Sequence, residues 1–175
     1  TQSLAAYDKY LEGVKLFNQI KWADAKEKYQ EAVDIDSTFF EAYYYLGLAQ
    51  WWDKTDMDSN NPSGDATLKL ILDKKLYHNE LEKLAAEGAF NVINDNYDIA
   101  LSIYKKLIKK EPDNKLNWYG IGEAYYHSAT NSCNCGSCSS CKRGVATQEE
   151  NYPKALSAMQ QVLELDPDFH VALYH

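Results

Sequence analysis

The residues best suited to chemistry are four cysteines that stand within nine positions of one another, in the order Cys-x-Cys-x-x-Cys-x-x-Cys. They are Cys133, Cys135, Cys138 and Cys141, in a segment rich in Ser, Asn and Gly that cannot form a core. Four thiolates at this spacing can converge on one soft metal ion, because zinc accepts four sulfur ligands and similar spacings hold iron–sulfur clusters. The same residues can instead form two local disulfides, for which three pairings exist, or remain free thiols. The spacing leaves these alternatives open, with one Zn ion or an iron–sulfur cluster as the candidate cofactor.

A second segment offers oxygen ligands at alternate positions, Asp56, Asp58 and Asn60, as at the start of a calcium-binding loop. The glycine and the closing glutamate of such a loop are replaced by Asn61 and Thr67, so a solvated acidic turn is the favoured interpretation. The four histidines are scattered, and the sequence contains no glycine-rich phosphate loop, nucleophile elbow or His-Glu-x-x-His helix. We therefore expect no enzyme and assign no catalytic residue.

Two small residues recur along the chain and indicate an internal repeat. The glycines are 34, 41 and 34 positions apart, and the alanines are 41, 34 and 55 apart; they are Gly13, Gly47, Gly88 and Gly122, and Ala25, Ala66, Ala100 and Ala155. A period of 34 with extra segments of 7 and 21 residues accounts for both series. The number of positions from each glycine to the alanine of the same repeat is larger in repeats two and four than in repeats one and three. This places both extra segments between the two helices of a repeat.

The repeat predicts pairs of helices whose backbones approach closely at the small residues. Four residues after each alanine, on the same helical face, come the larger side chains expected to close the core between repeats: Tyr29, Leu70, Tyr104 and Met159. Pro153 suits the first turn of the last full helix. We expect helices at about 4–18, 22–35, 40–53, 65–77, 81–93, 97–110, 115–129 and 151–164, and a further helix beginning near 169.

These residues resemble the tetratricopeptide repeat (TPR) family. The resemblance is carried in repeat one by Gly13, Trp22, Ala25, Tyr29 and Ala32, in repeat two by Tyr43, Leu46, Gly47 and Ala66, in repeat three by Gly88, Ala100, Tyr104 and Pro112, and in repeat four by Trp118, Ile121, Gly122, Tyr125, Ala155 and Pro167. It implies an all-α, right-handed α-solenoid of antiparallel helix pairs in a single domain, 1–175. The expected repeats are 6–39, 40–80, 81–114 and 115–169, followed by a partial repeat or cap at 170–175.

The resemblance also implies a concave groove lined by the first helix of each repeat, and a protein or peptide as the partner. The residues expected to line this aromatic groove are Tyr7, Tyr10, Phe17, Tyr44, Leu48, Trp51, Trp52, Tyr119 and Tyr126. Ala85, Ala89 and Val92 would make its middle shallow. Packing between repeats is the alternative role for each of these side chains. The basic clamp of chaperone-docking members is replaced by Tyr10, Val14, Tyr45, Glu82 and Ala86, so a heat-shock co-chaperone is not supported.

The charge balance limits the class of partner further. The chain carries 26 acidic and 18 basic residues and a net charge of -8, which repels phosphate backbones and makes nucleic acid an unlikely ligand. No stretch is apolar enough for membrane insertion, and the start at Thr1 slightly favours an exported location, periplasmic or extracellular, over a cytoplasmic one. Three functions follow as hypotheses: a non-enzymatic binding scaffold, a self-assembling solenoid stacked end to end as a homo-oligomer, or a metal-binding or redox module built on the cysteines.

Overall fold

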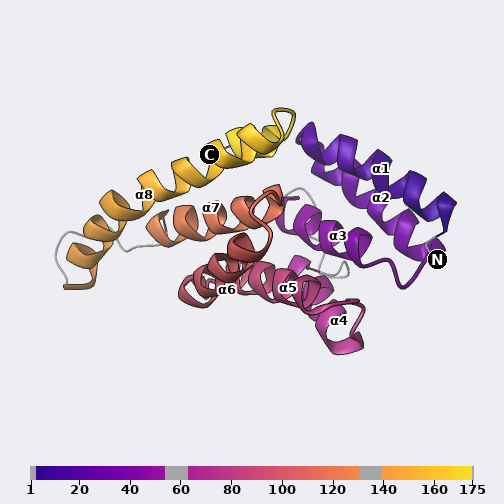
Figure 1. Cartoon of the computed structure of the whole chain (residues 1–175), viewed down its shortest axis with the longest axis horizontal. Helices are drawn as coiled ribbons and strands as arrows, with labels where there is room; N and C mark the ends of the chain where they lie inside the picture. Colours follow the sequence, from indigo (N-terminus) through magenta and orange to yellow (C-terminus); the bar gives the residue numbers. More distant parts are fainter. Residues whose placement is uncertain (1–2, 54–62, 131–138, 175) are drawn as a thin grey trace.

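The computed structural model describes residues 3–53, 63–130 and 139–174, with the backbone alone for 139–147. Within these ranges every regular element is a helix (Figure 1). In chain order the elements are α1 (Leu4–Asn18), α2 (Trp22–Ile35), α3 (Phe40–Trp52), α4 (Gly64–Lys74), α5 (Glu80–Ile93), α6 (Tyr97–Lys110), α7 (Lys115–Thr130), α8 (Ser139–Leu165) and the short 3-10 helix η1 (His170–Leu173). Each helix packs mainly against its neighbours in the chain, which confirms the TPR-like all-α solenoid.

The helix boundaries agree with the sequence pattern for the first seven helices to within about three residues, and α8 is the exception. It begins at Ser139 rather than near residue 151, so Pro153 lies inside the helix and not in its first turn. A proline has no backbone N–H, and the carbonyl of Glu149 therefore receives no helical hydrogen bond from position 153. The prediction treated this proline as a start signal, but a proline within a helix is tolerated at the loss of one backbone hydrogen bond.

In repeats one, three and four, a glycine on the first helix contacts a large side chain on the second helix, as the sequence predicted. A Cβ added to Gly13 would meet the ring of Tyr29, and one added to Gly88 would meet the ring of Tyr104. A Cβ added to Gly122 would meet the end of Met159 in the same way. These glycines let the large side chain lie directly on the backbone of the facing helix.

In repeat two the predicted register is wrong by two residues. Ala66 is exposed and Leu70 keeps 37% of its surface, whereas Gly64 and Leu68 are buried. A Cβ on Gly64 would overlap the backbone carbonyl oxygen of Gly47, and Leu68 lies where Tyr29 and Tyr104 lie in their repeats. The extra segment of seven therefore divides into five residues between α3 and α4 and two after α4. The sequence does not show how many of the extra residues belong to the loop, so it does not fix which face of α4 points inward. Ala66 was therefore wrongly aligned with Ala25 and Ala100.

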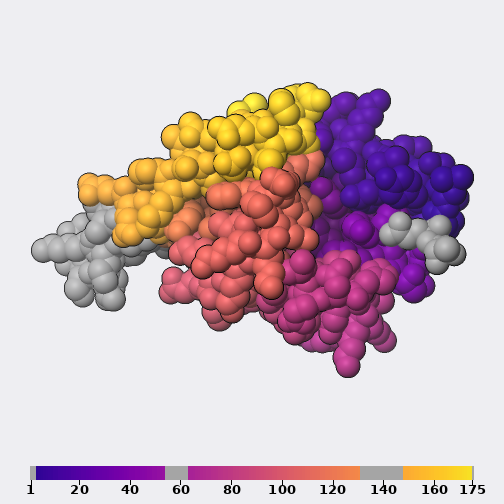
Figure 2. Space-filling model, in the orientation of Figure 1, coloured from indigo at the N-terminus to yellow at the C-terminus, as the bar shows by residue number. Residues whose placement is uncertain are grey.

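The C-terminal segment folds back onto the first repeat. Phe169 is fully buried, with its ring 6.3 Å from the ring of Phe17 and 5.3 Å from that of Tyr119. The ring of Tyr174 lies 4.9 Å from that of Trp22. In Figure 2 the atoms of the C-terminal segment lie directly against those of α1 and α2. The segment expected to be a partial repeat or cap thus joins the last repeat to the first.

Candidate functional site

The centre of the concave face is a packed core rather than an open aromatic groove. Of the nine side chains predicted to line the groove, five are buried: Phe17, Tyr44, Leu48, Trp52 and Tyr119. The indole N–H of Trp52 on α3 donates a buried hydrogen bond of 2.8 Å to the phenolic oxygen of Tyr119 on α7. Helix α5, which lies between these two helices in the chain, places the small side chains of Ala86 and Ala89 in the same core, and this leaves room for the two large rings to meet. The shallow middle expected from the sequence is filled by large residues of the neighbouring repeats.

Burial also changes the acidity of the tyrosines in this core. Burial raises the pKa of Tyr44 to about 12, and it raises the pKa of Tyr119 well above its ordinary value, with the charge of Glu123 adding to the effect. An ionised phenol would be desolvated at either position. Both side chains are therefore neutral hydrogen-bonding groups of the core across the physiological pH range.

The other four predicted residues lie at two separate ends of the first helices. Tyr7 and Tyr10 of α1 lie beside Phe39, with ring centroids 6.4 and 5.1 Å from it. Trp51 and Tyr126, at the opposite ends of α3 and α7, lie 5.2 and 5.4 Å from the ring of His127. All four keep some exposed surface. The nine residues therefore form a buried centre with accessible aromatic groups at either end.

A pocket opens at the end of the concave face where α3, α5 and α7 begin, and we call it the mouth pocket. It has a volume of about 280 Å³ and is lined by residues from the first helix of all four repeats. Tyr10 of α1, Tyr44 and Tyr45 of α3 and Leu116 of α7 supply part of its wall. The volume is near the low end of ligand pockets, roughly 300 Å³, and suits one side chain of a partner rather than a folded domain.

Carboxylates and amides supply the polar part of the mouth pocket. At the start of α5, the carboxylate of Glu82 accepts hydrogen bonds from the backbone N–H of His78 at 2.6 Å and from the side chain of Asn79 at 2.8 Å, and it lies 3.1 Å from Nδ1 of His78. Asn79 in turn accepts from the backbone N–H groups of Leu81 and Glu82, each at 2.9 Å. The Asn79 side chain thus satisfies donors that a helix start otherwise leaves unpaired.

Glu111, just before α7, has a related arrangement. Its carboxylate accepts from the side-chain amides of Asn114 at 3.2 Å and Asn117 at 3.3 Å. Glu41, in the first turn of α3, is the third carboxylate of the pocket. The sequence analysis named Glu82 only as a departure from the chaperone clamp and missed Glu41 and Glu111. An acidic residue at or just before the start of three first helices was the available signal.

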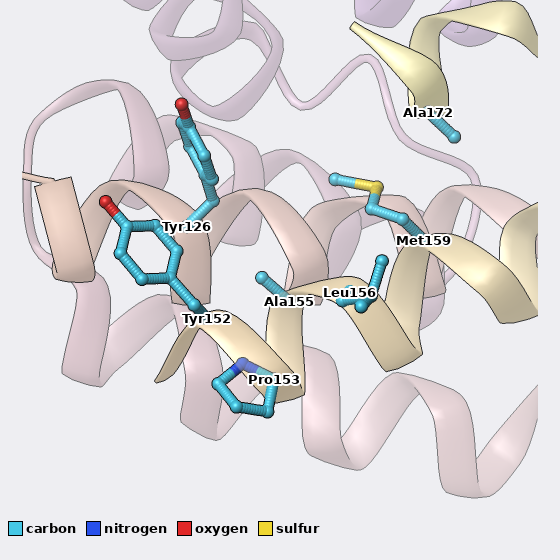
Figure 3. Close-up of a pocket in the computed structure, with 7 residues that line it drawn as sticks. All are labelled: Tyr126, Tyr152, Pro153, Ala155, Leu156, Met159 and Ala172. Carbon is cyan, nitrogen blue, oxygen red and sulfur yellow. The ribbon is translucent and has the colours of Figure 1, made fainter. Parts of the chain in front are cut away.

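A second pocket, almost entirely apolar, lies between α7, α8 and η1 (Figure 3). It has a volume of about 420 Å³ and is lined by Tyr126, Tyr152, Pro153, Ala155, Leu156, Met159 and Ala172. Tyr152 and Leu156 are exposed beside it. None of the described residues that line this apolar pocket is charged, so they can contribute contact area but little chemical selectivity.

The predicted metal ligands fall outside the part of the chain that the structure describes. Cys133, Cys135 and Cys138 lie outside the described residues, as does the side chain of Cys141, and so do Asp56, Asp58 and Asn60. Across the described ranges, no group of three or more His, Cys, Asp or Glu side chains is arranged to hold a metal ion. The same part of the chain contains no helix long and apolar enough to span a membrane.

Comparison with known proteins found a match for one segment of the chain. Residues 13–52, from the middle of α1 to the end of α3, match the family model described as TPR repeat. No curated protein matches the chain. The matched segment contains Gly13, Ala25 and Tyr29, the packing residues from which the repeat was inferred.

Proposed function

Because this chain carries the TPR repeat in an all-α solenoid, and TPR repeats generally mediate protein–protein interaction, we propose that it is a non-enzymatic scaffold that binds a protein or peptide partner at the mouth pocket. The observation that supports this proposal is the composition of the pocket, to which the first helices of all four repeats contribute. Buried aromatic side chains around a small cavity are typical of sites that take an anchor residue of a partner. The proposal moves the contact site from the aromatic groove to the end of it.

The test uses a substitution that fills the pocket without changing charge. Ala85 lies on the pocket wall, partly exposed, whereas Ala66 is exposed on α4 away from the pocket. Ala85→Phe should remove partner capture from an extract, and Ala66→Phe should leave it unchanged. Equal capture by the two variants, with helicity intact in both, would remove the mouth pocket from the proposal.

A second measurement protects against a folding artefact in Ala85→Phe. A photoreactive phenylalanine placed at the partly exposed Leu81, another pocket residue, should crosslink the same partner in an otherwise unaltered chain. The same group placed at Ala66 should not. Crosslinking from position 66 alone would place the partner on another face of the protein.

A second candidate function, end-to-end assembly, is favoured by the apolar groups at the two ends of the chain. The first helix exposes Leu4, Tyr7 and Leu11, spaced as one helical face, and α8 exposes Tyr152 and Leu156 beside the apolar pocket. Two such surfaces on opposite ends would give a heterologous contact between copies. Light scattering should then show a mass that rises with concentration and falls on Leu11→Glu; a monomer at all concentrations excludes this candidate.

A further inference from the structure

The second half of α6 presents only lysines to solvent. One side of this helix packs against α5 and α7 (Figure 1), through the buried residues Ala100, Ile103, Tyr104 and Leu107. On the opposite side, every exposed side chain from Lys105 to the end of the helix is a lysine. We call this group the lysine face: Lys105, Lys106, Lys109 and Lys110. A chain with a net charge of -8 thus carries a positive surface on its third repeat.

None of these four lysines has a carboxylate partner among the residues that the structure describes. Ion pairs in this part of the chain are formed instead by Lys9, Lys26, Lys28, Lys69, Lys83, Lys115 and Lys154. The acidic residues nearest in the sequence do not neutralise the face. Asp98 precedes Lys105 by about 10 Å along the helix, and Glu111, beyond the helix end, accepts hydrogen bonds from two asparagine side chains.

The spacing of the lysine face works against the helix that carries it. Lys105 and Lys109 are four positions apart, as are Lys106 and Lys110, so each pair stands side by side, where like charges repel. The C-terminal end of a helix favours positive charge, but the effect is confined to the last turn, which contains Lys109 and Lys110. It gives no reason for Lys105 and Lys106. A negative group supplied by a partner would relieve the repulsion at all four.

Tyr125 of α7 holds one of these lysines in place without neutralising it. The ammonium nitrogen of Lys105 lies 5.6 Å from the centroid of the Tyr125 ring, and that of Lys154 on α8 lies 5.4 Å from the same centroid. An aromatic ring attracts cations but carries no net charge. Lys154 is paired with Glu150, whereas the charge of Lys105 stays available to a partner.

The extent of the lysine face favours a short acidic segment over a larger polyanion. Lys105 and Lys109 are about 6 Å apart along the helix axis, and side chains at alternate positions of an extended chain are separated by a similar distance, about 6.6 Å. Carboxylates at alternate positions would therefore match the lysines. A nucleic acid or a membrane surface would extend past the face by more than the Debye length of about 8 Å and would meet the acidic remainder of the chain.

We propose that the lysine face binds an acidic segment of a protein partner, with carboxylates about 6 Å apart. The described residues that line the mouth pocket include none from α6, so this surface is separate from the pocket and the inference goes beyond the proposed function. Charge drives the association, so the affinity falls as the salt concentration rises. A scaffold with these two surfaces holds two segments of one partner, or two partners, at the same time.

The test titrates the intact protein at low salt with a peptide of four Ser-Glu repeats, acetylated and amidated at its ends, and follows the lysine side-chain signals in NMR spectra. Saturable shifts should be largest at the four lysines of the face. The matching Ser-Gln peptide should bind about tenfold more weakly or worse. Equal binding of the two peptides, or larger shifts at lysines outside α6, would overturn the proposal.

Matched variants locate the binding. The quadruple variant Lys105→Gln, Lys106→Gln, Lys109→Gln and Lys110→Gln keeps good helix formers and should weaken peptide binding about tenfold or more. Arginine at the same four positions keeps the charge and should retain binding.

The control variant replaces four other exposed lysines that have no ion pair in the described part of the chain: Lys15→Gln, Lys21→Gln, Lys74→Gln and Lys75→Gln. It removes the same net charge and should change the affinity by no more than about threefold. Equal losses in the two glutamine variants would assign the binding to net charge and overturn the site.

Two further probes separate the other anionic partners. An oligothymidylate with as many charges as the peptide, and vesicles that contain phosphatidylserine, should both bind more weakly than the Ser-Glu peptide. Tighter binding of either probe, lost in the quadruple glutamine variant of α6, would assign the lysine face to a nucleic acid or to a membrane surface and overturn the proposal.

The two proposals fail separately. Ala85→Phe should leave binding of the Ser-Glu peptide unchanged. If the peptide does not bind but Ala85→Phe removes partner capture, the lysine-face inference fails and the proposed function stands. If the peptide binds at the lysine face but Ala85→Phe leaves partner capture unchanged, the proposed function fails and the inference stands.

Discussion

Trp52 and Tyr119 are 67 positions apart in the chain and are joined by a buried hydrogen bond of 2.8 Å from the indole N–H to the phenolic oxygen. This bond links the first helix of repeat two to the first helix of repeat four. In a solenoid, repeats usually contact only their nearest neighbours. The direct contact means that this solenoid is coiled tightly enough for its inner surface to become part of the core.

Tyr119→Phe should destabilise the fold by about 1–3 kcal/mol, because it removes the oxygen that accepts the buried hydrogen bond from the indole N–H of Trp52. The measurement is the urea unfolding midpoint of the variant against the wild type. Tyr152→Phe is the control, since Tyr152 is exposed and its change should fall within about 0.5 kcal/mol. A loss for Tyr119→Phe no larger than that of the control would contradict the inter-repeat hydrogen bond.

Phe169→Ala should cost about 3–5 kcal/mol, because Phe169 is fully buried between Phe17 and Tyr119. Exposure of the inner aromatic surface should also increase binding of the fluorescent dye ANS. Leu173→Ala, at a side chain with 65% of its surface exposed, should change neither quantity appreciably. Matching results for the two variants would show that the C-terminal segment does not hold repeat one to repeat four.

Gly64→Ala should destabilise the protein by about 1–3 kcal/mol, because the added methyl group would overlap the backbone of Gly47. At the exposed Ala66, substitution by glycine should cost only the difference in helix propensity, about 1 kcal/mol or less. A more informative pair is Ala66→Leu, which should be tolerated, and Gly64→Leu, which should prevent normal packing. Thermal unfolding followed by circular dichroism measures the stability of all four variants. Larger losses at position 66 than at position 64 would support the register expected from the sequence.

Asp166→Asn should lower stability at pH 7 by about 0.5–1 kcal/mol, the usual scale of a partly exposed ion pair. The hydrogen bond from Lys115 lowers the pKa of the Asp166 carboxyl below its ordinary value of 3.8, so the charged form favours the folded state. This contribution is present above pH 3.8 and is lost as the pH falls through the lower folded pKa. The asparagine keeps the acceptor for the backbone N–H of Asp168.

Because the pKa of Asp166 is lower in the folded state, the effect of Asp166→Asn on stability should depend on pH. The stability difference between wild type and variant should be constant near neutral pH and should shrink below about pH 3.8. High salt should reduce it as well. Urea unfolding at several pH values tests this, and a difference that grows in acid would show that the carboxyl does not gain stability from Lys115.

The cysteine run carries the prediction of a metal site, local disulfides or free thiols. Intact mass under native and denaturing conditions, with elemental analysis and thiol titration, separates the three. One equivalent of zinc or a cluster would support the metal, a mass lower by about four hydrogens would support two disulfides, and four titratable thiols would exclude both. Replacement of all four cysteines by serine should leave the helical content unchanged, and a global loss of helicity would show that the segment is structural.

The sequence alone determined the elements of this protein. Glycine and alanine at a period near 34 residues predicted the helix pairs, and the aromatic residues four positions after Ala25 and Ala100 predicted the packing of those pairs. These features are local, since they depend on helical periodicity and on contacts between neighbouring helices. The Cys segment was assigned to repeat four for the same reason, but two of the seven extra residues assigned to the turn of repeat two follow α4 instead.

Only the tertiary structure decided which side chains reach the surface. Periodicity places Tyr44, Trp52 and Tyr119 on the inner face, but how tightly the repeats coil depends on the sum of small angles at every interface. The alanines of α5 let α3 meet α7, and Phe169 then covers what remained, so the groove became core. The helical register after each loop was undetermined in the same way, which is why Gly64 and not Ala66 occupies the packing position in repeat two. Glu41, Glu82 and Glu111 belong to three separate helix starts, and only the tertiary structure brings them together.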